Sequence, residues 1–224
     1  MRPRCNRKGN PVFIILRKAK NIFLITLGVY VVSIGAGFIA GKADWVDFDK
    51  IKDSSIIKFS RDLEKKVPGY GHLIKKYKEW HNKMRDKYLS SKDSFGMGKL
   101  IFINNWIVAN LTMMVRTIFV APLLLIIPGK FFQGVAFADI PESARLASVF
   151  LLEFGGYFLI ICATLSALIW TVFYRTFNFA SRIGAMIGGF KLIGLAFAVS
   201  AVTMLIGSIL ETRFIMNLFE KFGG

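Results

Sequence analysis

Residues 22–40, IFLITLGVYVVSIGAGFIA, form a run of nineteen residues without a charge. A helix needs about 20 apolar residues to cross the hydrocarbon core of a bilayer. Further apolar runs of at least this length follow at 100–128, 147–174 and 183–210. The sequence therefore predicts an all-α integral membrane protein, a bundle of four to five transmembrane helices in which residues 22–40 are the first span.

The number of spans depends on residues 100–138, where Asn, Arg, Pro and Gly interrupt the apolar character. One interpretation is a kinked helix over 100–128 followed by an interfacial elbow at 129–146. The other is two short helices that form a re-entrant pair, since irregular backbone is tolerated at membrane depth where protein or water satisfies it. The two interpretations stay open, so the segment crosses the membrane once or twice.

The charge balance is strongly basic for so apolar a chain. Hydrophobic residues make up 54% of the sequence, the mean hydropathy is +0.50 and the formal net charge is +16. In a chain dominated by spanning segments, such a basic excess favours contact with anionic lipid head groups. No aromatic and basic module typical of nucleic-acid binding is present. The predicted surroundings are thus the lipid bilayer and its anionic head groups, with no nucleic acid.

The distribution of charge along the chain predicts an orientation. The tail at 1–21 carries seven Lys or Arg and no acid, and such tails stay in the cytoplasm. The first span is then a retained signal anchor in a multi-pass protein of the cell membrane. It sends the polar, helical domain at 41–99 to the extracytoplasmic side, although that domain's own Lys and Arg argue for the opposite side. With four spans the tail at 211–224, a short amphipathic helix, returns to the cytoplasm.

The polar domain contains one clear amphipathic helix after Pro68 and Gly69. Large apolar or aromatic residues recur there every three or four positions, with Lys and Arg on the other faces; they are Leu73, Tyr77, Trp80, Met84 and Tyr88. This helix is expected either to contact a partner or the lipid interface, or to pack against Ile56, Ile57 and Phe59.

Several polar residues fall inside the apolar runs and are candidate site residues. Arg116, Glu153 and Lys191 are ionisable, and such a group at membrane depth is costly unless it is paired or hydrated. Glu153 is therefore expected to pair with Lys191 or Arg116, to line an ion or proton path, or to snorkel toward the interface. Asn104 and Asn105 begin their run, where they are expected to be solvated or capping, or to hydrogen-bond another helix.

Glycine pairs indicate where helices pack closely. Gly37 and Gly41 form a GxxxG pair at the end of the first span, and Gly184 and Gly188 form another in the last run. Small residues at this spacing let two helix backbones approach each other. Both pairs are predicted helix-packing sites.

No enzyme, metal or cofactor signature is present. His72 and His81 lie nine residues apart without an HExxH motif, and neither a GxSxG elbow nor a phosphate-binding glycine loop occurs. Cys5 and Cys162 do not form a CxxC pair or a disulfide framework. We expect a protein without catalytic residues, metal or cofactor.

Four short stretches carry a family resemblance: FINNWIVAN at 102–110, PGKFFQG at 128–134, LLEFGGY at 151–157 and LIGSILE at 205–211. Over about residues 100–211 the chain resembles the stage II sporulation protein M family. The best matching marks are Asn104, Asn105 and Glu211. The family's typical His-Gly step at its midhelix Glu is absent here, where Phe154-Gly155-Gly156 stand instead, so the sequence departs from the family pattern at Glu153.

The resemblance implies a non-enzymatic multipass membrane protein. In spore formers, members of the family act as membrane anchors that gather septal cell-wall hydrolases. The expected function is thus a scaffold or assembly partner of a membrane complex, working with a membrane-protein partner or as a homo-oligomer. The alternative is a transporter, channel or permease subunit that uses its intramembrane charges.

Overall fold

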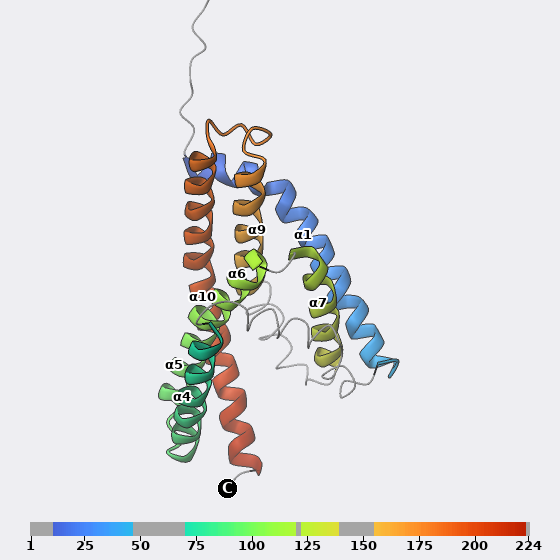
Figure 1. Ribbon diagram of the computed structural model, residues 1–224. Helices are drawn as coiled ribbons and strands as arrows, with labels where there is room; N and C mark the ends of the chain where they lie inside the picture. The colour runs from blue at the N-terminus through green and yellow to red at the C-terminus, as the bar shows by residue number, and fades with distance from the viewer. Residues whose placement is uncertain (1–10, 47–69, 120–121, 139–154, 223–224) are drawn as a thin grey trace, which may run out of the picture.

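The computed structural model describes residues 11–46, 70–119, 122–138 and 155–222, and every regular element in these ranges is helical. The elements, shown in Figure 1, are α1 (Pro11–Lys42), α4 (Tyr70–Ser90), α5 (Ser94–Ile103), the π-helix η1 (Asn104–Ala109), α6 (Asn110–Phe119), α7 (Pro122–Ala138), α9 (Phe158–Val172) and α10 (Arg182–Phe222). The prediction of an all-α protein is confirmed.

Three of the described helical stretches are long and apolar enough to cross a membrane: Val12–Lys42, Gly155–Val172 and Arg182–Lys221. They support the prediction of a membrane protein, whereas the count of four to five spans is not confirmed. In the region 100–138, α5, η1 and α6 follow one another without a gap as far as Phe119. α7 is a separate helix of 17 residues, at the lower end of the length that a span requires.

The helix bounds differ from the sequence prediction in three places. α1 begins at Pro11, inside the predicted tail, because proline is well suited to the first helical position. α7 continues through Pro128 and Gly129 to Ala138 and occupies the first part of the predicted elbow; residues 139–146 lie outside the described ranges. α10 runs without a break from the last predicted span through Phe222, so the predicted C-terminal tail extends the same helix.

α1 and α7 lie side by side (Figure 1) and meet at glycines. A Cβ atom added at Gly37 would overlap the backbone carbonyl of Phe131, and one added at Gly134 would overlap the carbonyl oxygen of Ile34. At Gly41 an added Cβ would lie 2.8 Å from the Cβ of Ala138. The structure therefore places Gly37 and Gly41 where the backbones of two helices touch, and α7 supplies the reciprocal glycine.

α9 and α10 form a second close pair, joined by a turn at the upper end in Figure 1. An added Cβ at Gly189 of α10 would lie 2.5 Å from the Cβ of Ala167 in α9. Gly188 faces the ring of Phe179 in the turn. Gly184 lies in the first turn of α10, where its N–H donates to the Ser181 hydroxyl over 3.0 Å. The helix-to-helix contact is thus made at Gly189, while Gly184 belongs to the helix start.

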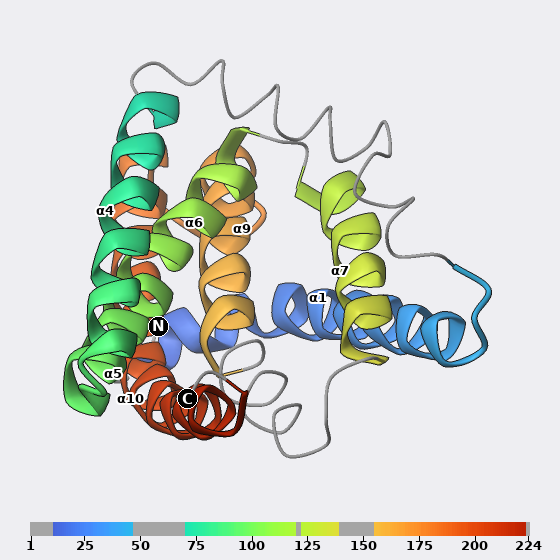
Figure 2. The same cartoon turned by 90° about the horizontal axis from the view of Figure 1, so that it is seen from below.

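α9 is the central helix of the fold. Residues 160–166 are all buried, which is the pattern of a helix covered on every side. Figure 2 shows α4 on one side of the α9–α10 pair and α7, packed on α1, on the opposite side. The core around α9 includes Trp170, Ala185, Leu192 and Ile22, so residues from the first and last spans meet there.

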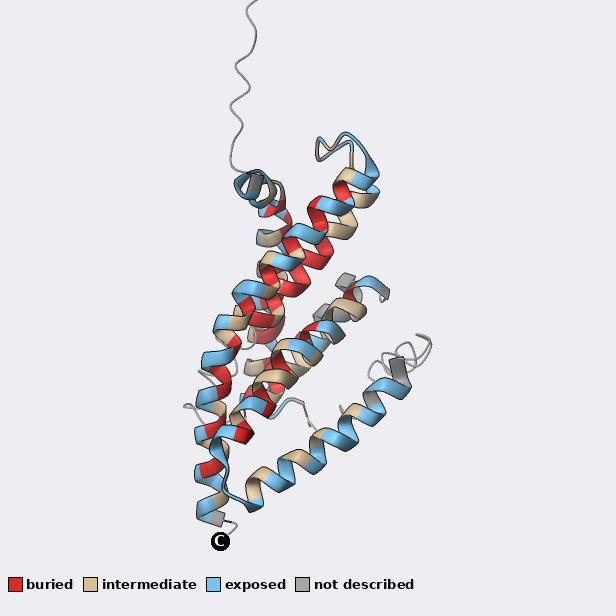
Figure 3. Ribbon diagram, turned by 90° about the vertical axis from the view of Figure 1, so that its left-hand side faces the viewer, coloured by how far each residue is buried: buried red, intermediate tan, exposed pale blue. Residues whose placement is uncertain are grey.

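α4 is the least covered of the described helices, and Figure 3 shows no buried residue along it. Its apolar packing is in its C-terminal half, where Met84, Tyr88 and Leu89 pack against Met97, Leu100 and Ile101 of α5. Within the predicted apolar stripe, Leu73 is 67% exposed and Trp80 is 46% exposed. The alternative cover for this stripe, Ile56, Ile57 and Phe59, lies outside the described residues.

Candidate functional site: a polar network at the π-helix

The site is built on η1, a π-helical insertion between α5 and α6. Helical backbone angles continue on both sides, with φ −61° and ψ −44° at Ile103 and φ −63° and ψ −43° at Asn110. A π-turn inside an α-helix is rare and is often found at functional sites. Here it begins at Asn104 and Asn105, which extend toward α4 and α10 respectively through the hydrogen bonds they make.

A chain of hydrogen bonds connects the surface helix α4 with α10 through this insertion. The Tyr77 hydroxyl of α4 donates to Asn104 Oδ1 over 3.2 Å. Asn104 Nδ2 donates to Asn105 Oδ1 over 3.2 Å, and Asn105 Nδ2 donates to Glu211 Oε2 over 3.3 Å. Every donor in the chain points toward Glu211, so the carboxylate of α10 is the final acceptor.

Asn105 is the centre of the network. Its side-chain oxygen also accepts a hydrogen bond of 3.1 Å from the Tyr157 hydroxyl, which lies at the start of α9. The residue is buried, with 7% of its surface exposed. Buried amides need their hydrogen bonds, and Asn105 satisfies its own with groups from η1, α9 and α10. One side chain thus fixes the relative position of three helices.

A second group of polar contacts continues along α10 from the same insertion. Trp106 Nε1 donates to the carbonyl oxygen of Phe197 over 3.0 Å, and Asn110 Nδ2 donates to Ser200 Oγ over 3.3 Å. The Thr203 hydroxyl donates to the carbonyl oxygen of Gly155 over 2.7 Å. Asn110 is fully buried, and its Oδ1 has no partner among the described residues. Together with Asn105, these contacts form a polar strip along α10 that faces η1, the start of α6 and the residues just before α9.

The electrostatics of α4 next to the network follow from partial burial. Burial raises the pKa of the Tyr77 phenol, so Tyr77 remains protonated and able to donate to Asn104. Burial, assisted by the nearby Arg85 guanidinium, lowers the pKa of His81. The imidazole therefore adds no charge to α4 at neutral pH.

The structure brings together Asn104, Asn105 and Glu211, three residues that the sequence analysis singled out separately. Lys191 is exposed on α10 and makes no hydrogen bond or ion pair with another described residue. Arg116 lies in α6, and Glu153 lies outside the described residues. The proposed pairing of Glu153 with Lys191 or Arg116 therefore stays a prediction, and the described site is centred on Asn105.

Two tyrosines complete the network, and neither is a predicted site residue. The helical pattern places Tyr77 in the apolar stripe of its helix, and Tyr157 lies in an apolar run. Ser200 and Thr203 are likewise absent from the predicted site, although hydroxyl residues in an otherwise apolar span are a visible signal. Small hydroxyl residues in such spans often hydrogen-bond across helices. Here Ser200 accepts from Asn110 at the start of α6, and Thr203 donates to Gly155 just before α9.

The hydrogen-bond network holds helices together, and Glu211 is its one acidic group. Among the described residues, no group of three His, Cys, Asp or Glu side chains could hold a metal ion. No protein-family model, no curated protein and no solved structure matches this chain. The contacts of its own residues are therefore the basis for a functional proposal.

Proposed function

We propose that this protein is a non-enzymatic scaffold or assembly partner of a membrane complex, with α4 as its contact surface. The observation that carries the proposal is the hydrogen-bond chain from Tyr77 through Asn104 and Asn105 to Glu211. This hydrogen-bond chain connects α4, an otherwise exposed helix, to the central bundle. A contact helix held in one position loses less entropy when a partner binds than a mobile one does.

The outer surface of α4 has the composition of a contact surface. Its cations are all exposed and outnumber the carboxylates Glu79 and Asp86; they are Lys75, Lys76, Lys78, Lys83, Arg85 and Lys87. Asp86 is already paired with Arg85 at 3.0 Å. The exposed side chains of Leu73 and Trp80 lie on the same helix. Exposed aromatic and basic residues of this kind fit a partner with an acidic surface.

The resemblance to stage II sporulation protein M belongs to the same proposal, because members of that family gather other proteins at a membrane. In this proposal the partner is a membrane protein or a further copy of the chain. The N-terminus lies in the cytoplasm of the cell that makes the protein, and α4 lies on the outer side of the cell membrane.

Reversing charge on one face of α4 is expected to remove the partner. Lys76 and Lys83 are seven positions apart and share a helix face, so we expect Lys76→Glu with Lys83→Glu to reduce partner recovery several-fold. The measurement is a mild-detergent pull-down of the tagged full chain from its own host, quantified by mass spectrometry. The matched control, Lys42→Glu with Lys92→Glu, makes the same charge change at exposed sites outside α4 and should recover the partner normally.

Two results would contradict this proposal. Equal recovery by both double variants would show that the basic face of α4 is not the contact surface. Recovery of the protein as a monomer, with neither a membrane-protein partner nor a second copy of the chain, would favour the transporter alternative.

The orientation has its own test at Ser91, an exposed residue just after α4. In a Cys5→Ser background, we expect Ser91→Cys to react with a membrane-impermeant thiol reagent on intact cells. Cys162, the other thiol, is buried and provides the internal control. Labelling that occurs only after lysis would place α4 in the cytoplasm.

A transporter, channel or permease subunit is the second candidate function. The polar strip along α10 favours it, because Glu211 and the unpartnered oxygen of Asn110 are polar groups inside a helix bundle. Polar and ionisable residues in such positions often mark ion or proton paths. This function requires the carboxyl group of Glu211 itself, whereas the scaffold requires only its hydrogen bond.

A further inference from the structure

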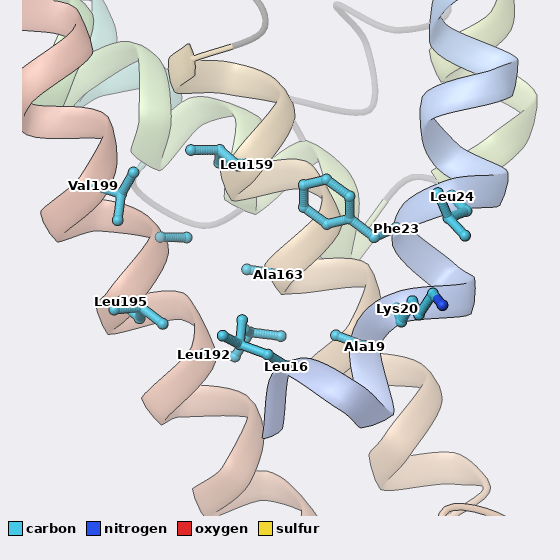
Figure 4. Close-up of a pocket in the computed structure, with 11 residues that line it drawn as sticks. Leu16, Ala19, Lys20, Phe23, Leu24, Leu159, Ala163, Leu192, Leu195 and Val199 are labelled. Atoms are coloured by element: carbon cyan, nitrogen blue, oxygen red, sulfur yellow. The ribbon is translucent and has the colours of Figure 1, made fainter. Parts of the chain in front are cut away.

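An open groove runs along the three helices that have the length of a membrane span (Figure 4). Its volume is about 340 Å³, within the range of small-molecule sites. α9 forms its floor, while α1 and α10 form its walls. The residues that line it are almost all aliphatic or aromatic, and Lys20 is the charged exception; they are Leu16, Ala19, Lys20, Phe23, Leu24, Leu159, Ala163, Leu192, Leu195, Ala196 and Val199.

Lys20 lies at the boundary of the charge-free part of α1. No charged residue occurs between Lys20 and Lys42, a stretch that matches the hydrocarbon thickness of about 30 Å. Lys20 is therefore expected at the level of the lipid head groups. Phe23 and Leu24 extend the groove one turn deeper, so the groove begins at a cation and continues into the hydrocarbon layer.

The end of the molecule around Lys20 has an excess of positive charge. Arg17 and Lys20 are exposed on α1, and Arg175 and Arg182 are exposed in the turn to α10 and at its start. Lys18 differs from them, because its ammonium donates to carbonyl oxygens in that turn. The described carboxylates belong to segments at the lower end in Figure 1, namely the end of α1, α4 with the turn that follows it, and the second half of α10; they are Asp44, Glu79, Asp86, Asp93, Glu211 and Glu220.

Among the described residues no carboxylate lies near the cations at this end, so an anionic ligand would complement their charge. The groove beyond Lys20 offers only apolar contacts, so the rest of the ligand must be apolar. We propose that the groove binds one acyl chain of an anionic phospholipid, whose phosphate contacts Lys20. The site is independent of α4 and of the scaffold role, and it is a specific binding site in addition to general contact with the bilayer.

The test uses the full-length protein reconstituted into phosphatidylcholine vesicles that contain a phospholipid with a photoactivatable acyl chain. The probe carries either a phosphatidylglycerol or a phosphatidylcholine head group. Peptide mass spectrometry then locates the label. We expect label on the groove-lining peptides of α1 and α10, with a preference for phosphatidylglycerol of about fivefold, the effect of one Lys at a membrane surface.

Two variants and two matched controls assign the label to the groove. Val199 lines the groove and is 47% exposed, so Val199→Trp fills the groove without disturbing the core, and it should reduce groove labelling several-fold. Val202, on the same helix, is 62% exposed and does not line the groove, so Val202→Trp should leave labelling unchanged. Lys20→Gln should abolish the head-group preference, whereas Lys191→Gln should preserve it.

Other occupants of the groove would give different patterns. Equal labelling of wild type and Val199→Trp, spread over the outer faces of α1 and α10, would mean ordinary surrounding lipid and would overturn the proposal. Cross-links between two copies through the groove residues would overturn it in favour of a dimer. A head-group preference that survives Lys20→Gln would overturn the assignment of the phosphate to Lys20.

Discussion

Replacing Gly37 with leucine is expected to separate α1 from α7 and to lower the stability of the protein by ~3 kcal/mol. Even the first atom of a side chain at this position would overlap the backbone of Phe131. Backbone cannot rotate away as a flexible side chain can, so the two helices must move apart. In detergent we expect the apparent melting temperature to fall by roughly 10 °C, with loss of the monodisperse species at lower temperature.

Gly28 provides the matched control, because it lies in the same helix and an added Cβ there would meet nothing within 4 Å. Gly28→Leu should therefore leave the melting temperature close to that of the wild type. Gly134→Leu, on α7, should reproduce the effect of Gly37→Leu from the opposite side of the contact. If Gly37→Leu and Gly28→Leu melt at the same temperature, the contact between α1 and α7 is not as close as the structure has it.

Replacing Asn105 with leucine is expected to destabilise the bundle by ~3 kcal/mol. The substitution removes the hydrogen-bond donor to Glu211 and the acceptor for the Tyr157 hydroxyl. It also disconnects Asn104, and with it Tyr77 and α4, from the rest of the network. Thermal unfolding in detergent measures the loss, and faster proteolysis within α4 is expected as a second sign.

The double variant Asn105→Leu with Glu211→Leu separates two losses of stability: the loss caused by leaving the Glu211 carboxylate without its hydrogen bond, and the loss caused by altered packing. Removing both partners of a buried hydrogen bond costs less than removing one. We therefore expect the double variant to melt above Asn105→Leu alone. Equal melting temperatures would show that Glu211 does not depend on Asn105 for its hydrogen bond.

Glu211→Gln distinguishes the scaffold from the transporter. The amide oxygen of glutamine can still accept from Asn105 Nδ2, so stability and partner recovery should be nearly normal if Glu211 acts only as a hydrogen-bond acceptor. A transporter that uses the carboxyl group would keep its abundance but lose flux across a vesicle membrane. Normal abundance with lost flux would therefore reject the scaffold as the main function.

Local sequence patterns predicted the helices better than their junctions. Hydropathy placed spans at 22–40 and 183–210, and both lie within longer helices, α1 and α10. The elbow at 129–146 was predicted from Pro128 and Gly129, yet α7 continues through both residues. Proline and glycine are tolerated inside helices where neighbouring segments satisfy the backbone, and α1 lies directly against α7.

The candidate site could be predicted only in part. Asn104, Asn105 and Glu211 stood out because each is a polar residue in or beside an apolar run. Their meeting could not be predicted, because Asn105 and Glu211 are separated by 106 positions and no periodicity extends that far. The contribution of Tyr77 could not be predicted for a different reason. A tyrosine has an apolar ring and a polar hydroxyl, and the helical pattern of apolar residues takes account of the ring alone.

The sequence by itself determined that this protein is helical, that it has helices suited to a membrane, and that one end of α1 and one face of α4 are basic. These properties depend on composition and on the 3.6-residue period, which are local. Tertiary structure alone decided that Gly189 rather than Gly184 meets the neighbouring helix, that Asn105 joins three helices, and that a groove begins at Lys20. Each of these depends on which face of a helix meets its neighbour. That face is set by the rotation of the helix about its own axis, which the packing of side chains across the bundle determines.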